Sequence, residues 1–107
     1  MENKISGEIY IDTLKKIKEI LKNHFDIPIR EKSLDEIQME SLDTYLSIYK
    51  YSNEIFLIGG TFLGDYYQGV KFVNEISSLL LKEQVYFEIE LASKVGNLYI
   101  KNKNMNI

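Results

Sequence analysis

The sequence predicts an α+β fold, a mainly antiparallel sheet with two main helices on one face. Residues 85–92 alternate apolar and polar side chains, which is typical of a strand with one buried face. Residues 12–25 and 65–83 instead place apolar side chains at the spacing of an amphipathic helix. Ser52 and Asn53 form a turn signal between two further apolar segments, which favours a hairpin. Helices packed on one side of an antiparallel sheet satisfy both patterns.

The first elements along the chain are predicted to be a strand and a helix. Alternating isoleucines in residues 5–11 favour a strand, although two of them would also extend the apolar stripe of the next helix. Asp12 or Thr13 caps the helix over residues 12–25. Pro28 follows its end, because the residue before a proline avoids helical geometry.

The middle of the chain is predicted to hold a short helix and then the two strands of the hairpin. The letters SLDE at residues 33–36 have the capping-box pattern, so we expect a helix from there to about Leu42. Residues 44–51 and 54–62 are rich in aromatic and β-branched side chains and form the hairpin strands.

The C-terminal part is predicted to be a capped helix followed by two strands. Asp65 and Gln68 have the spacing of a capping box, which starts a helix that extends to about Glu83. The strand over residues 85–92 follows it, and residues 97–101 form the last strand. Residues 103–107 are polar and are expected to be a frayed tail.

The predicted element order is β-α-(α)-β-β-α-β-β. A ferredoxin-like, split βαβ arrangement with an extra C-terminal strand fits this order best. A chain of 107 residues supports one core, so we expect a single domain over residues 1–107.

The composition excludes several classes of protein. With 45% hydrophobic and 27% charged residues, the chain is globular rather than disordered. Cysteine is absent, which removes disulfides and thiolate metal sites, and no secretory signal is visible, so a cytoplasmic location is expected. No apolar run reaches about 18 residues, so no membrane span is predicted. The net charge is −3 and Arg30 is the only arginine, which argues against nucleic-acid binding.

The glycines of residues 58–64 resemble part of a phosphate-binding loop but lack its cation. Gly59 and Gly64 have the right spacing, yet Asp65 stands where the loop needs a lysine. Two unit charges about 4 Å apart interact by about 4 kcal/mol at an effective dielectric constant near 20, so repulsion replaces attraction. We therefore expect Gly59 and Gly60 to mark a bulge or a close backbone approach.

Other chemical patterns are weak, and no catalytic, metal or cofactor residue is predicted. His24 is the only histidine and suits the C-terminal end of its helix. Glu36, Glu40 and Asp43 would share one side of the predicted short helix, where a solvated acidic face is a simpler interpretation than a cation site.

The tyrosines are the most informative feature, because eight occur in this short chain and several alternate along predicted strands. Tyr45, Tyr49 and Tyr51 share one side of the strand over residues 44–51, opposite its leucine and isoleucine. Tyr86 shares one side of its strand with Glu88 and Glu90. If helices cover the apolar side of the sheet, the other side carries tyrosine, serine and glutamate. Such rings give large contact areas, although they also stabilise sheets by cross-strand pairing alone.

These observations lead to a first hypothesis, a non-enzymatic interaction protein. The tyrosine and acidic sheet face, helped by the acidic segment 31–43, would bind another protein with a basic surface. Small inhibitors such as immunity or counter-defence proteins have this design, by analogy of size and charge alone. The alternatives are a small-molecule-binding or enzymatic domain with a pocket near residues 59–65, and a homo-oligomeric subunit that uses the same sheet face.

Overall fold

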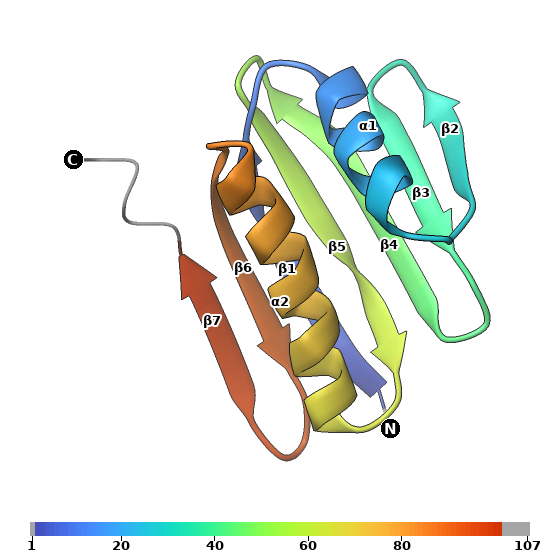
Figure 1. The fold of residues 1–107 in the computed structure, drawn as a ribbon, viewed down its shortest axis with the longest axis vertical. Helices are drawn as coiled ribbons and strands as arrows, with labels where there is room; N and C mark the ends of the chain where they lie inside the picture. Colours follow the sequence, from blue (N-terminus) through green and yellow to red (C-terminus); the bar gives the residue numbers. More distant parts are fainter. Residues whose placement is uncertain (1, 102–107) are drawn as a thin grey trace.

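The computed structural model describes residues 2–101, which form one seven-stranded sheet and two helices (Figure 1). The elements in chain order are β1 (Glu2–Tyr10), α1 (Leu14–His24), β2 (Ile29–Ser33), β3 (Glu36–Glu40), β4 (Thr44–Ser52), β5 (Ile55–Leu63), α2 (Tyr66–Lys82), β6 (Tyr86–Ala92) and β7 (Asn97–Lys101). The tail predicted at residues 103–107 lies outside the described residues. None of the helices in the described part is long and apolar enough to cross a membrane.

The α+β class and the antiparallel sheet are confirmed, but the strand order is not that of a classic ferredoxin-like sheet. The strand order is β2-β3-β4-β5-β1-β6-β7, and every neighbouring pair is antiparallel. A split βαβ unit needs a helix to return the chain to a parallel strand. Here β5 and β6 are both antiparallel to β1, which lies between them, so they run in the same direction and α2 connects them across β1. The sheet departs from the classic arrangement because the β2–β3 hairpin, inserted between α1 and β4, adds two strands at one edge, and β7 adds one at the other.

The short helix predicted from residue 33 is also wrong, because residues 29–40 form the β2–β3 hairpin. The Ser33 hydroxyl accepts a hydrogen bond from the Asp35 backbone N–H at 3.1 Å, so it stabilises a turn rather than a helix cap. Ile37 and Met39 are both buried and alternate with polar neighbours. A strand buries this alternating pair on one face, which a helix could not do.

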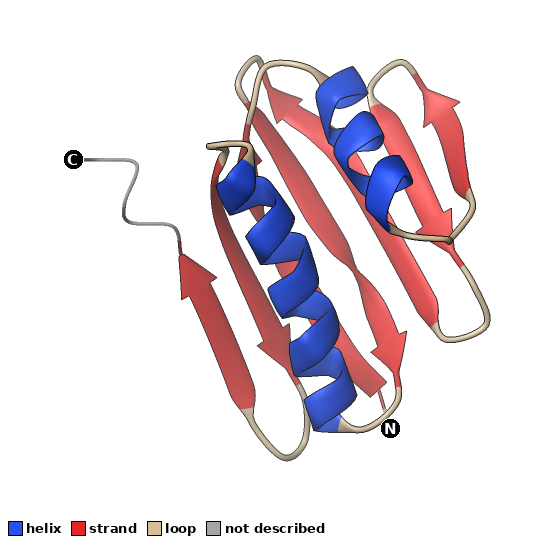
Figure 2. Cartoon of the chain, in the orientation of Figure 1, coloured by secondary structure: helices blue, strands red, loops and turns tan. Residues whose placement is uncertain are grey.

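Both helices lie on the same face of the sheet, and the core fills the space between the two layers (Figure 2). Of the two residues predicted to cap α1, Thr13 is the N-cap, and its hydroxyl accepts a hydrogen bond from the Lys16 N–H. Asp65 and Gln68 form the predicted capping box at the start of α2. The helices therefore cover the apolar side of the strands, and no element among residues 2–101 covers the other side of the sheet.

Candidate functional site

The candidate site is the face of the sheet opposite the helices, which we call the bare face. Its residues follow from the strand register and from alternation with buried neighbours. The side chains on it are Glu2, Lys4, Ser6, Glu8 and Tyr10 of β1, Arg30 of β2, Glu36, Gln38 and Glu40 of β3, Tyr45, Ser47 and Tyr49 of β4, Ile55, Leu57, Gly59, Thr61 and Leu63 of β5, Tyr86, Glu88, Glu90 and Ala92 of β6, and Asn97, Tyr99 and Lys101 of β7.

Two of the three tyrosines of β4, Tyr45 and Tyr49, lie on the bare face as the sequence predicts. Leu46 and Ile48 point into the core with 1% and 2% of their surface exposed. Tyr45 and Tyr49 point the other way and are 38% and 42% exposed. Tyr51 lies at the β-bulge where the register with β5 shifts, and it is more exposed still.

A row of small side chains crosses the centre of the bare face between these two rings. Ser47, Gly59 and Ser6 are direct neighbours on β4, β5 and β1. None of these side chains extends beyond a hydroxyl group. Tyr45 stands on one side of the row and Tyr49 on the other. The bare face therefore has a central strip of small side chains, flanked on β4 by two aromatic side chains.

Hydrogen bonds on β3 and β4 hold one side of this strip in place. Gln38 Nε2 donates to the Tyr45 phenol oxygen at 2.9 Å, and Ser47 Oγ donates to Glu36 Oε2 at 2.9 Å. Arg30 Nη2 donates to Gln38 Oε1 at 3.1 Å, which fixes the amide that orients the ring. The Tyr45 ring is consequently held in one orientation on the bare face.

Carboxylates concentrate on the other side of the bare face, on β1 and β6. Glu8 and Glu88 are directly opposite each other across this strand pair, an arrangement of like charges that is unfavourable by itself. The Tyr10 hydroxyl donates to Glu8, and the Lys101 ammonium forms an ion pair with Glu88 at 3.0 Å. Glu90 is the next carboxylate on the same face of β6. These interactions keep both opposed carboxylates in place at the surface.

The Tyr10 phenol should report on this cluster through its titration. The hydrogen bond to Glu8 and then burial raise the pKa of Tyr10 to about 12. Because the pKa of Tyr10 is higher in the folded state, the protonated phenol stabilises the fold. This contribution to the free energy of unfolding is complete below the unfolded pKa of about 10 and is lost as pH rises through about 12. We expect Glu8→Gln to lower the pKa of Tyr10, and a pH titration of the tyrosine ring signals by NMR measures this change. An unchanged titration in Glu8→Gln would contradict the hydrogen bond.

The predicted site residues do not all gather on this face. Glu36 and Glu40 lie on the bare face, although the sequence predicted a helix and they belong to a strand. Residues four apart share a face in a strand as they do in a helix. Asp43 instead accepts hydrogen bonds from Ser41 and Thr44 in the β3–β4 connection. Glu31 pairs with Lys18 of α1, on the helix side, and this neighbour lowers the pKa of its carboxyl. The acidic segment 31–43 is therefore divided and does not act as one surface.

Sequence reasoning missed several members of the bare face. Glu8 and Tyr10 on β1 and Tyr99 on β7 lie there too. The signal was present, since polar residues alternate with isoleucines in residues 2–10 and Tyr99 alternates with Leu98 and Ile100. The Tyr10 and Tyr86 rings meet edge to face with centroids 4.9 Å apart, which the sequence did not show.

The glycine segment does not form a phosphate cradle. Gly59 and Gly60 lie inside β5, paired with β1 on one side and β4 on the other. The Asp65 carboxylate accepts a hydrogen bond from the Gln68 N–H, so it occupies a backbone donor at the start of α2 that a phosphate would need. Gly60 is instead the close backbone approach that the sequence predicts, since a Cβ there would lie 1.9 Å from the Tyr45 carbonyl oxygen.

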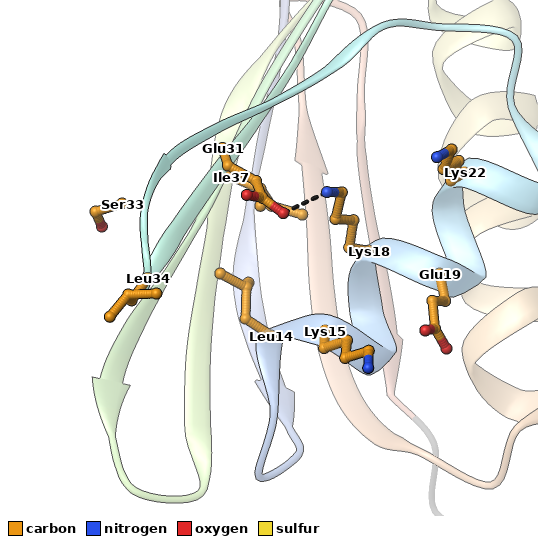
Figure 3. Close-up of a pocket in the computed structure, with 9 residues that line it drawn as sticks. All are labelled: Leu14, Lys15, Lys18, Glu19, Lys22, Glu31, Ser33, Leu34 and Ile37. Carbon is orange, nitrogen blue, oxygen red and sulfur yellow. Dashed lines mark hydrogen bonds and ion pairs between the residues drawn. The ribbon is translucent and has the colours of Figure 1, made fainter.

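One hollow lies on the helix side, between α1 and the β2–β3 hairpin (Figure 3). It measures about 410 Å³, and Leu14 and Ile37 line it together with lysines of α1. The Lys18–Glu31 ion pair crosses it (Figure 3). Within the described residues, no group of three histidine or carboxylate side chains could hold a metal ion. His24 lies elsewhere, at the end of α1, with Nε2 3.7 Å from a Glu75 carboxylate oxygen.

Comparisons with protein-family models, with curated proteins and with solved structures found no match for this chain. The functional conclusion therefore comes from the geometry of the bare face alone.

Proposed function

We propose that this protein is a non-enzymatic binding protein whose bare face docks a second protein with a basic surface. The observation that supports this proposal is the set of half-exposed tyrosines on a sheet face that neither helix covers. Tyrosine contributes rigid contact area with a polar tip at small entropy cost, so such a face is suited to binding another protein.

The charges of the bare face favour a basic partner. Its carboxylates are Glu2, Glu8, Glu36, Glu40, Glu88 and Glu90, and its cations are Lys4, Arg30 and Lys101. Two of these cations are already engaged, because Lys101 pairs with Glu88 and Arg30 donates to Gln38. The remaining field is negative, so it steers lysine- or arginine-rich surfaces toward the face and repels acidic ones, including nucleic acid and anionic membranes.

The same charges make a second copy of this chain a poorer occupant of the bare face. Two copies placed face to face would bring their carboxylates into one desolvated layer, where like charges repel. A basic protein would instead neutralise them. An inhibitor that neutralises a toxin or a host defence enzyme is the role that fits a small acidic binding protein best.

Gly59 gives the sharpest test, because it lies at the centre of the bare face with room above it. A Cβ at Gly59 would meet only the Ile5 carbonyl oxygen, at 4.0 Å. Gly59→Lys therefore places a long cation in the central strip of small side chains and leaves the strand pairing intact. We expect it to weaken binding of the basic partner at least about a hundredfold, whereas Gly59→Ala binds as the parent does.

The measurement is co-purification of the tagged protein from its host, followed by titration of the recovered partner with each variant. We expect a basic partner that dissociates faster as salt rises, because exposed charges are screened. If Gly59→Lys retains the partner with parental affinity, the bare face is not the docking surface. A thermal shift with a metabolite and no protein partner would favour the small-molecule alternative instead.

A further inference from the structure

The two edges of the sheet differ in how well they are protected against pairing with another strand. An edge strand presents unpaired N–H and C=O groups, and proteins usually block them with charges or bulges. On β2, Arg30, Glu31 and Lys32 are consecutive exposed charges, and the register with β3 shifts after Glu31. That edge has both kinds of protection.

Within the described residues, the β7 edge has neither kind of protection. Its pairing with β6 is regular over the whole strand. The one charge in β7 is Lys101, and its ammonium turns back to Glu88 at 3.0 Å on the bare face. Leu98 and Ile100 lie on the helix side and are only half-buried, because β7 extends beyond the outer side of α2 (Figure 1). This edge therefore combines backbone groups that no other strand of the described sheet pairs with and apolar side chains that are only partly buried.

We propose that β7 pairs with β7 of a second copy, antiparallel and centred on Tyr99, to form a dimer with a continuous sheet. This register is self-complementary, as a two-fold interface must be. Leu98 of one copy lies opposite Ile100 of the other, and the two Tyr99 side chains are opposite each other on the bare face. Asn97 lies opposite Lys101, so no like charges are brought together in this register.

The edge dimer is independent of the proposed function, because it leaves both bare faces open on the same side of a longer sheet. A short edge buries little area, so the dimer is weak and depends on concentration. It would present two docking surfaces side by side and raise the avidity for a partner with repeated basic sites.

The test is the sedimentation behaviour of the full chain over a range of concentrations, compared with two variants of Tyr99. This side chain is 58% exposed, so both substitutions keep the monomer folded, although Tyr99→Glu costs some stability because it places a carboxylate opposite Glu90 of β6. Tyr99→Lys or Tyr99→Glu alone places like charges opposite each other at the two-fold axis, and each raises the dimer dissociation constant at least about tenfold. An equimolar mixture of the two variants recovers the dimer, because opposite charges then meet there.

Gly59→Lys is the matched control, since it alters the centre of the bare face and not the edge, and it dimerises as the parent does. A parent chain that stays monomeric at every concentration would overturn the proposal. So would a dimer that Gly59→Lys disrupts and Tyr99→Lys does not. Neither result bears on the proposed docking of a basic partner, which is tested separately by titrating that partner with the Gly59 variants.

Discussion

Gly60→Ala should lower the free energy of unfolding by at least about 3 kcal/mol. A Cβ at this position would lie 1.9 Å from the Tyr45 carbonyl oxygen and 2.9 Å from Leu46 Cα. Both atoms belong to the backbone of β4, so no side chain can move aside. The β4–β5 pair must separate, and these strands carry the centre of the sheet.

Gly59→Ala is the control for this result, because it makes the same chemical change one residue earlier. Its Cβ enters open space on the bare face, and alanine in a strand avoids an entropy cost of about 0.5–1 kcal/mol. We therefore expect equal or slightly higher stability than the parent, measured by urea denaturation of both variants. If the two substitutions have the same effect, the described approach of β4 and β5 at Gly60 is wrong.

Asn3→Asp should lower the free energy of unfolding by about 3–5 kcal/mol near neutral pH. Asn3 is fully buried beneath α2, and its Nδ2 donates to the carbonyl oxygens of Phe62 and Gly64 at 3.1 Å each. The aspartate would replace this donor by a charged oxygen that faces two carbonyl oxygens. The loss follows from both the missing hydrogen bonds and the burial of an unpaired charge.

The pH dependence separates this cause from a loss of packing. Burial raises the pKa of the introduced carboxyl above its unfolded value of about 3.9. The destabilisation is therefore smallest below about pH 4, where the carboxyl is protonated in both states. It grows as pH rises through the folded pKa. The exposed Asn74→Asp on α2 should change stability by less than about 0.5 kcal/mol, without this pH dependence. A penalty for Asn3→Asp that stays constant with pH would contradict the buried site.

Local patterns in the sequence predicted most elements of this fold. The strand over residues 85–92, the capped helix from Asp65 and the strand at residues 97–101 were all found within a few residues of their ends. Each has a signal that depends only on neighbours in sequence, either a period or a cap. The same signal placed the β4 tyrosines on one side and the leucine and isoleucine on the other.

The errors have two physical causes. Ser33 followed by Glu36 fits a helix cap, but the same hydroxyl can accept from the N–H two residues later and close a turn. The alternation of Ile37 and Met39 with polar neighbours, seen over only five residues, was the weaker signal. The strand order depends on pairs distant in sequence, such as Gly7 with Ile58, and no local pattern encodes them.

The candidate site was predicted in part for the same reason. Side chains on one strand were grouped correctly, because alternation assigns a face. Which strands lie next to each other was not predictable, so the opposition of Glu8 and Glu88 and the contact of Tyr10 with Tyr86 became visible only in the folded chain.

Radical footprinting of the tyrosines, in the free protein and with its partner bound, tests the proposed docking surface most directly. Tyr67 lies on α2 and is 82% exposed, so it is an internal control on the opposite side of the molecule. We expect Tyr45 and Tyr49 to lose most of their reactivity in the complex while Tyr67 keeps its own. Protection of Tyr67 with unchanged reactivity of Tyr45 and Tyr49 would show that the partner binds the helices, and the proposed function would fail.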